Sequence, residues 1–324
     1  MATPNSLPPI SRFFFRLSSK QRAFGPRLGI RLPIDGGALR VDHFDATSMA
    51  VTMPWPAWLC RENGQVCLAS ALAVCDETST FAMGAWDKSL RPGVSVVLSA
   101  QREATTPTIE PGEPLTFSSS LIKAGATLAW IHLEVRRGSE VIATGRHLKF
   151  QPAGLPPGYT ILTHPIMRPV LQTAMDYMVE RTPDAMAPAE LPTGPRREVL
   201  SMSPAPADES TSALPSPLLA DPIAPTAFSA ALDARHGNPG RSLHGGCASM
   251  LLEEACSASY CLAHGAAAPP PVQRIQVSLL GAIDLNKPKT VGVNAVMSAR
   301  EGRAHAVLRR AGVSTPAVEG DVWW

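Results

Sequence analysis

The residues from Asn238 to Glu254, NPGRSLHGGCASMLLEE, place an amide, an imidazole and two glycines at the start of an apolar segment. The first N–H groups of a helix lack intrahelical partners and carry the positive end of its dipole. Gly245 and Gly246 let a ligand approach them, and Asn238 adds a side-chain donor. His244 either orients the loop or contacts the ligand. The pattern predicts a site for a carbonyl oxygen that gains negative charge; plain glycine capping is the alternative.

Glu253 follows His244 within the same predicted helix. At about 1.5 Å per residue the two lie about 13 Å apart along the axis, so Glu253 cannot act at the start of its own helix. A buried carboxylate is costly unless it is paired or functional. If two such helices pack antiparallel, the carboxylate lies opposite the start of the other helix. The alternative is a polar stripe of Glu253 and Glu254 at a sheet edge.

A similar apolar stretch in the first half, residues 67–86, predicts a second buried helix. Alignment of this segment with residues 245–264 places Cys67, Leu68 and Ala69 at the positions of the His-Gly-Gly. The same alignment places Asp76 at the position of Glu253. The first copy therefore keeps a carboxylate but lacks the donor loop. Its nearest asparagine, Asn63, is out of register with Asn238.

These helices need a sheet to position them. Residues 93–150 contain four strand-like runs separated by short turns, which predicts an antiparallel meander after the first helix. Three further runs between residues 272 and 313 follow the second helix. The order indicates an internal duplication of the α+β class, each copy a long helix wrapped by an antiparallel sheet. The last residues, STPAVEGDVWW, alternate little, so the second sheet is predicted to be one strand short.

The predicted organisation has a basic N-terminal segment, two domains, a packing helix and a proline-rich linker between them. Residues 1–34 carry six Lys and Arg and no acid, which fits a mitochondrial-type presequence or a basic segment with an early strand. The predicted boundaries are 1–30 for the N-terminal segment, 31–152 for the first domain, 153–182 for the packing helix, 183–225 for the linker and 226–324 for the second domain.

Composition excludes several classes of protein. The chain has 324 residues, 45% of them hydrophobic, and a net charge of +2 without a basic stripe, which argues against a nucleic-acid partner. No apolar run is long enough to span a membrane, and no secretory pattern is present. An intracellular location, cytoplasmic or mitochondrial, is expected. The six cysteines lack metal-binding spacing and are expected to be reduced core residues: Cys60, Cys67, Cys75, Cys247, Cys256 and Cys261.

The sequence resembles the hotdog-fold acyl-coenzyme A thioesterases, in particular the branch of acyl-coenzyme A thioesterase 13 and the phenylacetate-pathway thioesterases. In the first half the resemblance rests on VCDETSTFAM, PGVSVVLSA and GATLAWIHLEVRRGSEVIATGRHLKF. In the second half it rests on NPGRSLHGGCASMLLEE. The resemblance implies two hotdog domains, each a long central helix wrapped by an antiparallel sheet, whose active sites lie at the domain interface.

The resemblance also implies residue roles. Asn238, His244 and Gly245 match the residues that hold the thioester carbonyl, and Asp76 and Ser95 match those that position the attacking water. Because these sets fall in different halves, the two domains are expected to pair within one chain and form one intact hybrid site. The second site, the Cys67 loop facing Glu253 with Val272 near the serine position, is expected to be degenerate.

The implied activity is hydrolysis of an acyl-coenzyme A to free acid and coenzyme A, without metal or redox cofactor. Water attack and direct carboxylate attack through an anhydride both remain open. Gly246 is expected at the substrate, and Arg146, His147 and Lys149 either meet coenzyme A phosphates or form a solvated strand end. The rival functions are a non-catalytic acyl-coenzyme A binder or scaffold and a hotdog hydratase or dehydratase. The acyl type and the formation of a homodimer also stay open.

Overall fold

The computed structural model describes residues 40–45, 47–55, 59–60, 67–86, 93–103, 109–151, 200–205, 221–233, 236–238 and 242–324, and a few single residues between 170 and 181. The predicted N-terminal segment 1–30 lies outside them. So does most of the predicted packing helix 153–182, of which Val170, Thr173, Ala174, Tyr177 and Arg181 are described, all helical and exposed. No helix in this described part is long and apolar enough to cross a membrane.

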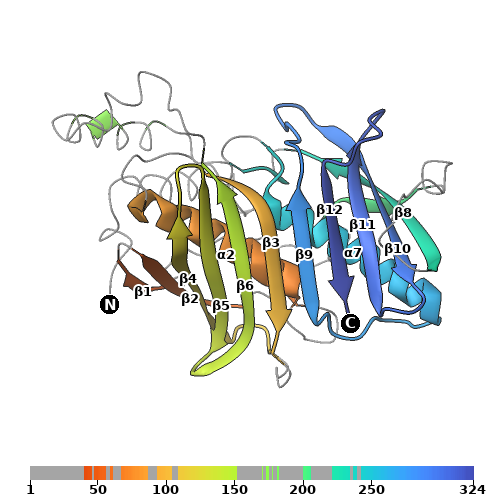
Figure 1. Cartoon of the computed structure of the whole chain (residues 1–324), viewed down its shortest axis with the longest axis horizontal. Coiled ribbons are helices and arrows are strands. Elements are labelled where there is room, and N and C mark those ends of the chain that lie inside the picture. The colour runs from red at the N-terminus through yellow and green to blue at the C-terminus, as the bar shows by residue number, and fades with distance from the viewer. Residues whose placement is uncertain are drawn as a thin grey trace.

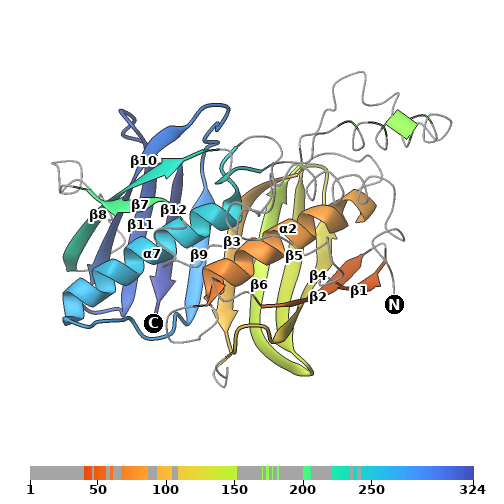
Figure 2. The same ribbon diagram turned by 180° about the vertical axis from the view of Figure 1, so that it is seen from behind.

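All described strands belong to one antiparallel sheet, and both long helices lie on the same face of it (Figures 1 and 2). The sheet order is β1-β2-β4-β5-β6-β3-β9-β12-β11-β10-β8-β7. The predicted α+β architecture of two helices wrapped by antiparallel sheet is therefore confirmed. The two halves join where β3 pairs with β9, with Leu98 opposite Val277.

The first half begins with a hairpin that the sequence does not reveal, and it continues with the predicted helix and four predicted strands. Its residues on the helix-facing side of the sheet alternate with more exposed ones, as in β2 and β5. Its elements are β1 (Arg40–Phe44), β2 (Ser48–Pro54), α2 (Leu68–Trp86), β3 (Val94–Arg102), β4 (Pro114–Ala124), β5 (Leu128–Arg137) and β6 (Glu140–Phe150).

The second half repeats the same order of elements. They are β7 (Met202–Pro204), β8 (Pro222–Leu232), α7 (Gly245–His264), β9 (Arg274–Leu279), β10 (Lys289–Ser298), β11 (Arg303–Arg310) and β12 (Val318–Trp323). The expectation of a missing last strand is wrong, because β12 pairs with both β11 and β9. Its inward positions are Val318, Gly320 and Val322. Gly320 hides the alternation: a Cβ there would lie 2.7 Å from the Gln276 carbonyl oxygen.

The predicted linker, residues 183–225, also needs correction, because it contains β7 and the start of β8. The prolines that suggested a linker occupy positions where a strand tolerates them. Pro222 is the first residue of β8, and Pro225 lies where the register between β8 and β10 shifts. The preceding residue, Ala224, has φ 50°, which fits this local irregularity.

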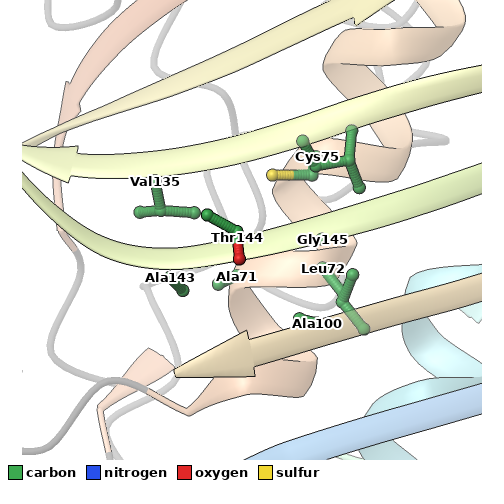
Figure 3. A pocket seen from close by; sticks show the side chains of 9 residues that line it. Ala71, Leu72, Cys75, Ala100, Val135, Ala143, Thr144 and Gly145 are labelled. Carbon is green, nitrogen blue, oxygen red and sulfur yellow. The ribbon is translucent and has the colours of Figure 1, made fainter. Parts of the chain in front are cut away.

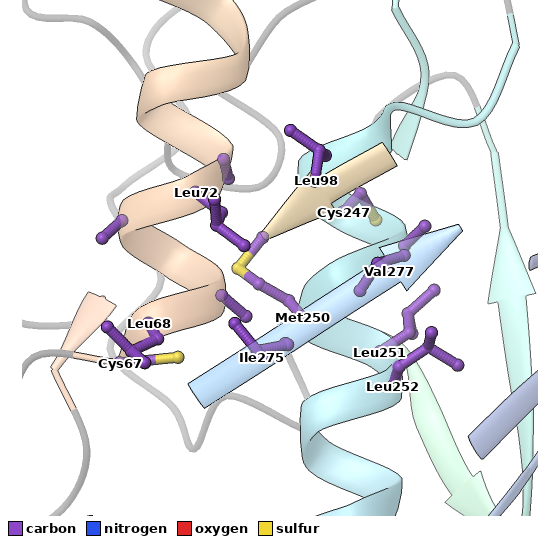
Figure 4. Packing of buried hydrophobic residues seen from close by; sticks show 14 of the residues in the cluster. Cys67, Leu68, Leu72, Leu98, Cys247, Met250, Leu251, Leu252, Ile275 and Val277 are labelled. Carbon is purple, nitrogen blue, oxygen red and sulfur yellow. The ribbon is translucent and has the colours of Figure 1, made fainter. Parts of the chain in front are cut away.

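The two helices run antiparallel and contact each other through their N-terminal halves (Figure 4). Helix α7 begins at its N-cap His244, which has φ −70° and ψ 135°, and it ends at the left-handed Gly265. Small residues allow close approach at the crossing: a Cβ on Gly246 would lie 2.3 Å from Ala73 Cα. The crossing thus places the start of each helix against the middle of the other.

Candidate active site

One predicted constellation is assembled where the start of α7 meets the middle of α2. His244 Nε2 lies 3.4 Å from Asp76 Oδ2. Ser95, at the start of β3, donates a hydrogen bond of 2.8 Å to Asp76 Oδ1. The structure therefore brings the acid and serine of the first half to the His-Gly-Gly of the second half. The antiparallel crossing of the two helices is the arrangement that does so.

Two further side chains from β6 complete the cluster around Asp76. His147 Nε2 lies 3.0 Å from Ser95 Oγ and 3.5 Å from Asp76 Oδ1. Lys149 Nζ lies 3.4 Å from the same carboxylate oxygen and donates a 2.6 Å hydrogen bond to Thr80 Oγ1. Asp76, His147 and Lys149 are 2%, 0% and 1% exposed, respectively. The candidate acid thus lies in a buried polar cluster inside the fold.

The expectation that His147 and Lys149 meet coenzyme A phosphates is wrong, because both side chains point inward. On β6 they alternate with the outward residues Arg146, Leu148 and Phe150, of which Arg146 and Phe150 are exposed. The two-residue periodicity of a strand puts His147, Lys149 and the buried Ala143 on one face, which is the signal that could have predicted it. Arg146 alone keeps its position as a candidate phosphate contact.

Residues of α2 that sequence reasoning missed also hold the cluster. Ser79 Oγ lies 2.8 Å from His147 Nδ1 and 3.0 Å from the Asp76 carbonyl oxygen. Thr80 donates to the same carbonyl at 2.7 Å. Hydroxyl groups that bond back to the preceding turn are common in helices, so these residues carry no distinct sequence signal. They fix the orientation of His147 and Lys149 from the helix side.

His244 has a defined protonation in this arrangement. Its Nδ1 accepts the Gly246 N–H at 3.2 Å, so the neutral ring carries its proton on Nε2, which faces Asp76. Burial lowers the pKa of His244, although the charge of Asp76 opposes this effect. Burial likewise lowers the pKa of His147 well below its usual value. Both rings are therefore neutral near pH 7.

Asp76 is held ionised in spite of its burial. Burial by itself raises the pKa of this carboxyl group, but the interactions with His244, Lys149 and His147 and the hydrogen bond from Ser95 outweigh it. Its pKa consequently lies well below the ordinary range. The adjacent Glu77 shows the opposite behaviour, because burial and the neighbouring Asp76 charge raise its pKa well above the usual value. Asp76 is thus a carboxylate and Glu77 a neutral acid.

Gly245 and Asn238 are the predicted donors to the carbonyl oxygen. A Cβ on Gly245 would lie 2.9 Å from Asp76 Oδ2, so only glycine fits against the acid. Among the described residues, none accepts the Gly245 N–H. Asn238 Oδ1 accepts the Ser242 N–H at 3.0 Å, which leaves its NH₂ group as the part available to a ligand. Gly246 has a different role from the one expected, because its N–H bonds to His244 and its Cα packs on Ala73.

The second constellation, at the start of α2, is closed by its own carboxylate. Glu253 is 0% exposed, and its Oε2 accepts the Ala69 N–H at 2.9 Å. The Cys67 thiol donates to its Oε1 at 3.1 Å. Val272, at the position expected for a serine, is buried and apolar. The longer Glu253 side chain therefore occupies the helix start that Asp76 leaves open in the first constellation.

A small apolar cavity lies between α2 and the sheet (Figure 3). Its volume of about 10 Å³ is at the lower limit for one water molecule. It is lined by Ala71, Leu72, Cys75, Ala100, Leu133, Val135, Ala143, Thr144 and Gly145. Gly145 pairs with Ala100, two register positions along the sheet from the His147–Leu98 pair.

Within the described residues, no group of three or more His, Cys, Asp or Glu side chains is placed to hold a metal ion.

Comparison with known proteins places the fold in a structural class. No protein-family model and no curated protein matches the sequence. Among solved structures, a candidate thioesterase from Novosphingobium aromaticivorans is 14% identical, with a TM-score of 0.55 over 88% of this chain and 97% of that one. An acyl-ACP thioesterase from Bacteroides thetaiotaomicron is 8% identical, with a TM-score of 0.51 over 85% and 97%.

These full-length similarities define the class: the chain has the tandem double-hotdog fold that is found among hotdog-fold thioesterases. The fold predicted from the sequence resemblance is thereby confirmed. At such low identity the similarity concerns the fold alone, and the chemistry of the site must be argued from its residues.

Proposed function

We propose that this protein is an acyl-coenzyme A thioesterase with one active site, formed between its two halves. The observation that carries the proposal is the ionised Asp76, bonded to Ser95, facing the open start of α7 at Gly245. A base and a set of oxyanion donors on opposite sides of one point are what hydrolysis of a thioester requires.

The reaction follows from this geometry. The thioester oxygen binds the Gly245 N–H and the Asn238 NH₂ group, each worth about 3 kcal/mol as the oxygen becomes an oxyanion. Asp76 takes a proton from a water molecule, which attacks the carbonyl carbon. The tetrahedral intermediate then collapses, the C–S bond breaks, and the thiolate leaves and takes up the proton. Water attack is favoured over an anhydride because Ser95 and Lys149 already bind Asp76 Oδ1.

The decisive experiment measures free thiol released from short, long and aryl acyl-coenzyme A esters. The same acyl groups on acyl carrier protein belong in the panel, because one structural neighbour is by name an acyl-ACP thioesterase. Turnover of any ester with an unchanged acyl chain supports the proposal. Binding of esters without thiol release would instead identify an acyl-coenzyme A binder, and water addition to an enoyl ester would identify a hydratase.

Asn238 offers a test of the oxyanion donors. Asn238→Asp keeps the oxygen that accepts the Ser242 N–H but removes the NH₂ donor, and kcat is expected to fall about 10²–10³-fold with an intact fold. Asn238→Ala should show a similar loss. Thiol release measures the loss of the donor, and thermal melts show whether the fold is intact. A loss in the alanine variant alone would mean that Asn238 only shapes its loop.

Glu253 provides the complementary prediction, for the closed constellation. Glu253→Gln keeps the side-chain shape and an acceptor for the Ala69 N–H but removes the charge. We expect thiol release at the wild-type rate and a loss of about 1–2 kcal/mol in the free energy of unfolding, because a charge-assisted bond at a helix start becomes neutral. Denaturant unfolding and steady-state assays measure both. Loss of turnover at unchanged stability would show that the second constellation is active.

A further inference from the structure

Lys149 stands out because a long cationic side chain is fully buried at the candidate site. It is among the largest side chains with less than 2% exposure. On β6 it pairs with Ser95, and its stem passes Gly93, where a Cβ would lie 3.3 Å from Lys149 Cδ. Its amine bridges Thr80 Oγ1 and Asp76 Oδ1. Burying an ammonium group is costly, so this position calls for a reason.

The titratable groups around Asp76 show what the amine does. From α2 itself come Cys75 and Glu77, whose pKa values burial raises, so both are neutral. From β6 comes His147 and from the start of α7 comes His244, whose pKa values burial lowers, so both rings are neutral as well. Burial also lowers the pKa of Lys149, but the charge and hydrogen bond of Asp76 oppose that effect. His244 contributes most to the lowered pKa of Asp76 and Lys149 contributes next. Because both rings are neutral, Lys149 is the group among these described residues that carries a positive charge.

The second half shows how a buried carboxylate is stabilised without such a lysine. Gly145 on β6 and Gly320 on β12 match, because each would place a Cβ within 2.7 Å of a carbonyl oxygen on the neighbouring strand. The positions that correspond to His147 and Lys149 are then Val322 and Trp324. Glu253 is stabilised instead by hydrogen bonds from the Cys67 thiol and the Ala69 N–H. Its side chain therefore occupies the start of α2.

We infer that Lys149 is a positioning residue that keeps Asp76 ionised from the sheet side, so that the start of α7 stays open to the substrate. The inference rests on the proposed function, because it assigns the amine a purpose at the same site. Lys149 stabilises the carboxylate at Oδ1, while Oδ2 faces His244 and Gly245. Without this amine, the carboxylate would either become protonated or bind the start of the facing helix. Glu253 binds the start of its facing helix in this way.

The first test is the pH profile of thiol release by Lys149→Met. Removing the cation raises the pKa of Asp76, so the base is lost at a higher pH and the acid limb of kcat/KM moves upward by about 1–3 pH units. At a pH above the new limb the rate should return toward wild type, which a misfolded site could not do. Lys149→Arg, which keeps a positive charge, should show a smaller upward shift of the acid limb than Lys149→Met. Lys123→Met, which removes an exposed lysine from β4, should leave the limb in place.

The second test needs no activity. Thermal melts at pH 7 of Asp76→Asn, Lys149→Met and the double variant form a cycle in which each single change leaves one buried charge unpaired. The double variant should melt higher than the sum of the two single effects predicts. Additive shifts, or an active Lys149→Met with an unmoved acid limb, would overturn the inference. If the wild type hydrolyses no ester, the proposed function fails, and the cycle still decides whether Lys149 holds Asp76 ionised.

Discussion

Asp76→Asn is expected to lower kcat for thiol release about 10³-fold, because the amide cannot accept the proton of the attacking water. The replacement is nearly isosteric and can still accept the Ser95 hydrogen bond at its remaining oxygen. KM should change little, because the carbonyl donors belong to the other half of the chain. Steady-state assays with the best ester of the panel measure both constants.

The control for this prediction is the matched acid of the second half. Glu253→Gln makes the same acid-to-amide change at the position that corresponds to Asp76, and it should leave turnover intact. Because Asp76→Asn leaves Lys149 without its charged partner, its melting temperature must be recorded as well. An active Asp76→Asn together with an inactive Glu253→Gln would show that the base lies in the second half, and it would refute the single hybrid site.

Gly246→Ala is expected to destabilise the protein by about 3 kcal/mol, the upper part of the range for overpacked sites. The added Cβ would lie 2.3 Å from Ala73 Cα and 2.4 Å from Ala73 Cβ, and a backbone atom cannot move aside as a flexible side chain can. The two helices must therefore separate, which also draws His244 away from Asp76. Denaturant unfolding measures the loss of stability, and thiol release should fall with it.

The matched control is Gly292→Ala on β10, where an added Cβ meets nothing within 4 Å. Stability there should stay the same or rise slightly, because alanine restricts the unfolded chain more than glycine does. Equal stability of Gly246→Ala and the wild type would show that the helices do not cross as closely as the structure has them.

Much of the fold could be predicted from local periodicity. Helices α2 and α7 and strands β3 to β6 coincide with the predicted segments, because long apolar runs and two-residue alternation identify buried helices and half-buried strands. The failures have local causes. Gly320 concealed β12 by taking an inward position without a side chain, and Pro222 and Pro225 made the start of β8 resemble a linker.

The candidate site divides in the same way. The chain itself determines that a His-Gly-Gly begins one helix and that Asp76 and Glu253 lie mid-helix, because capping and helical spacing are local properties. Only the tertiary structure decides which carboxylate meets which helix start, since that depends on how two surfaces distant in sequence cross. It also decides that Lys149 turns inward to Asp76 and that Glu253, one methylene longer, reaches the Ala69 N–H and closes its own site. Distances of one bond length select between these outcomes, and no periodicity in the sequence encodes them.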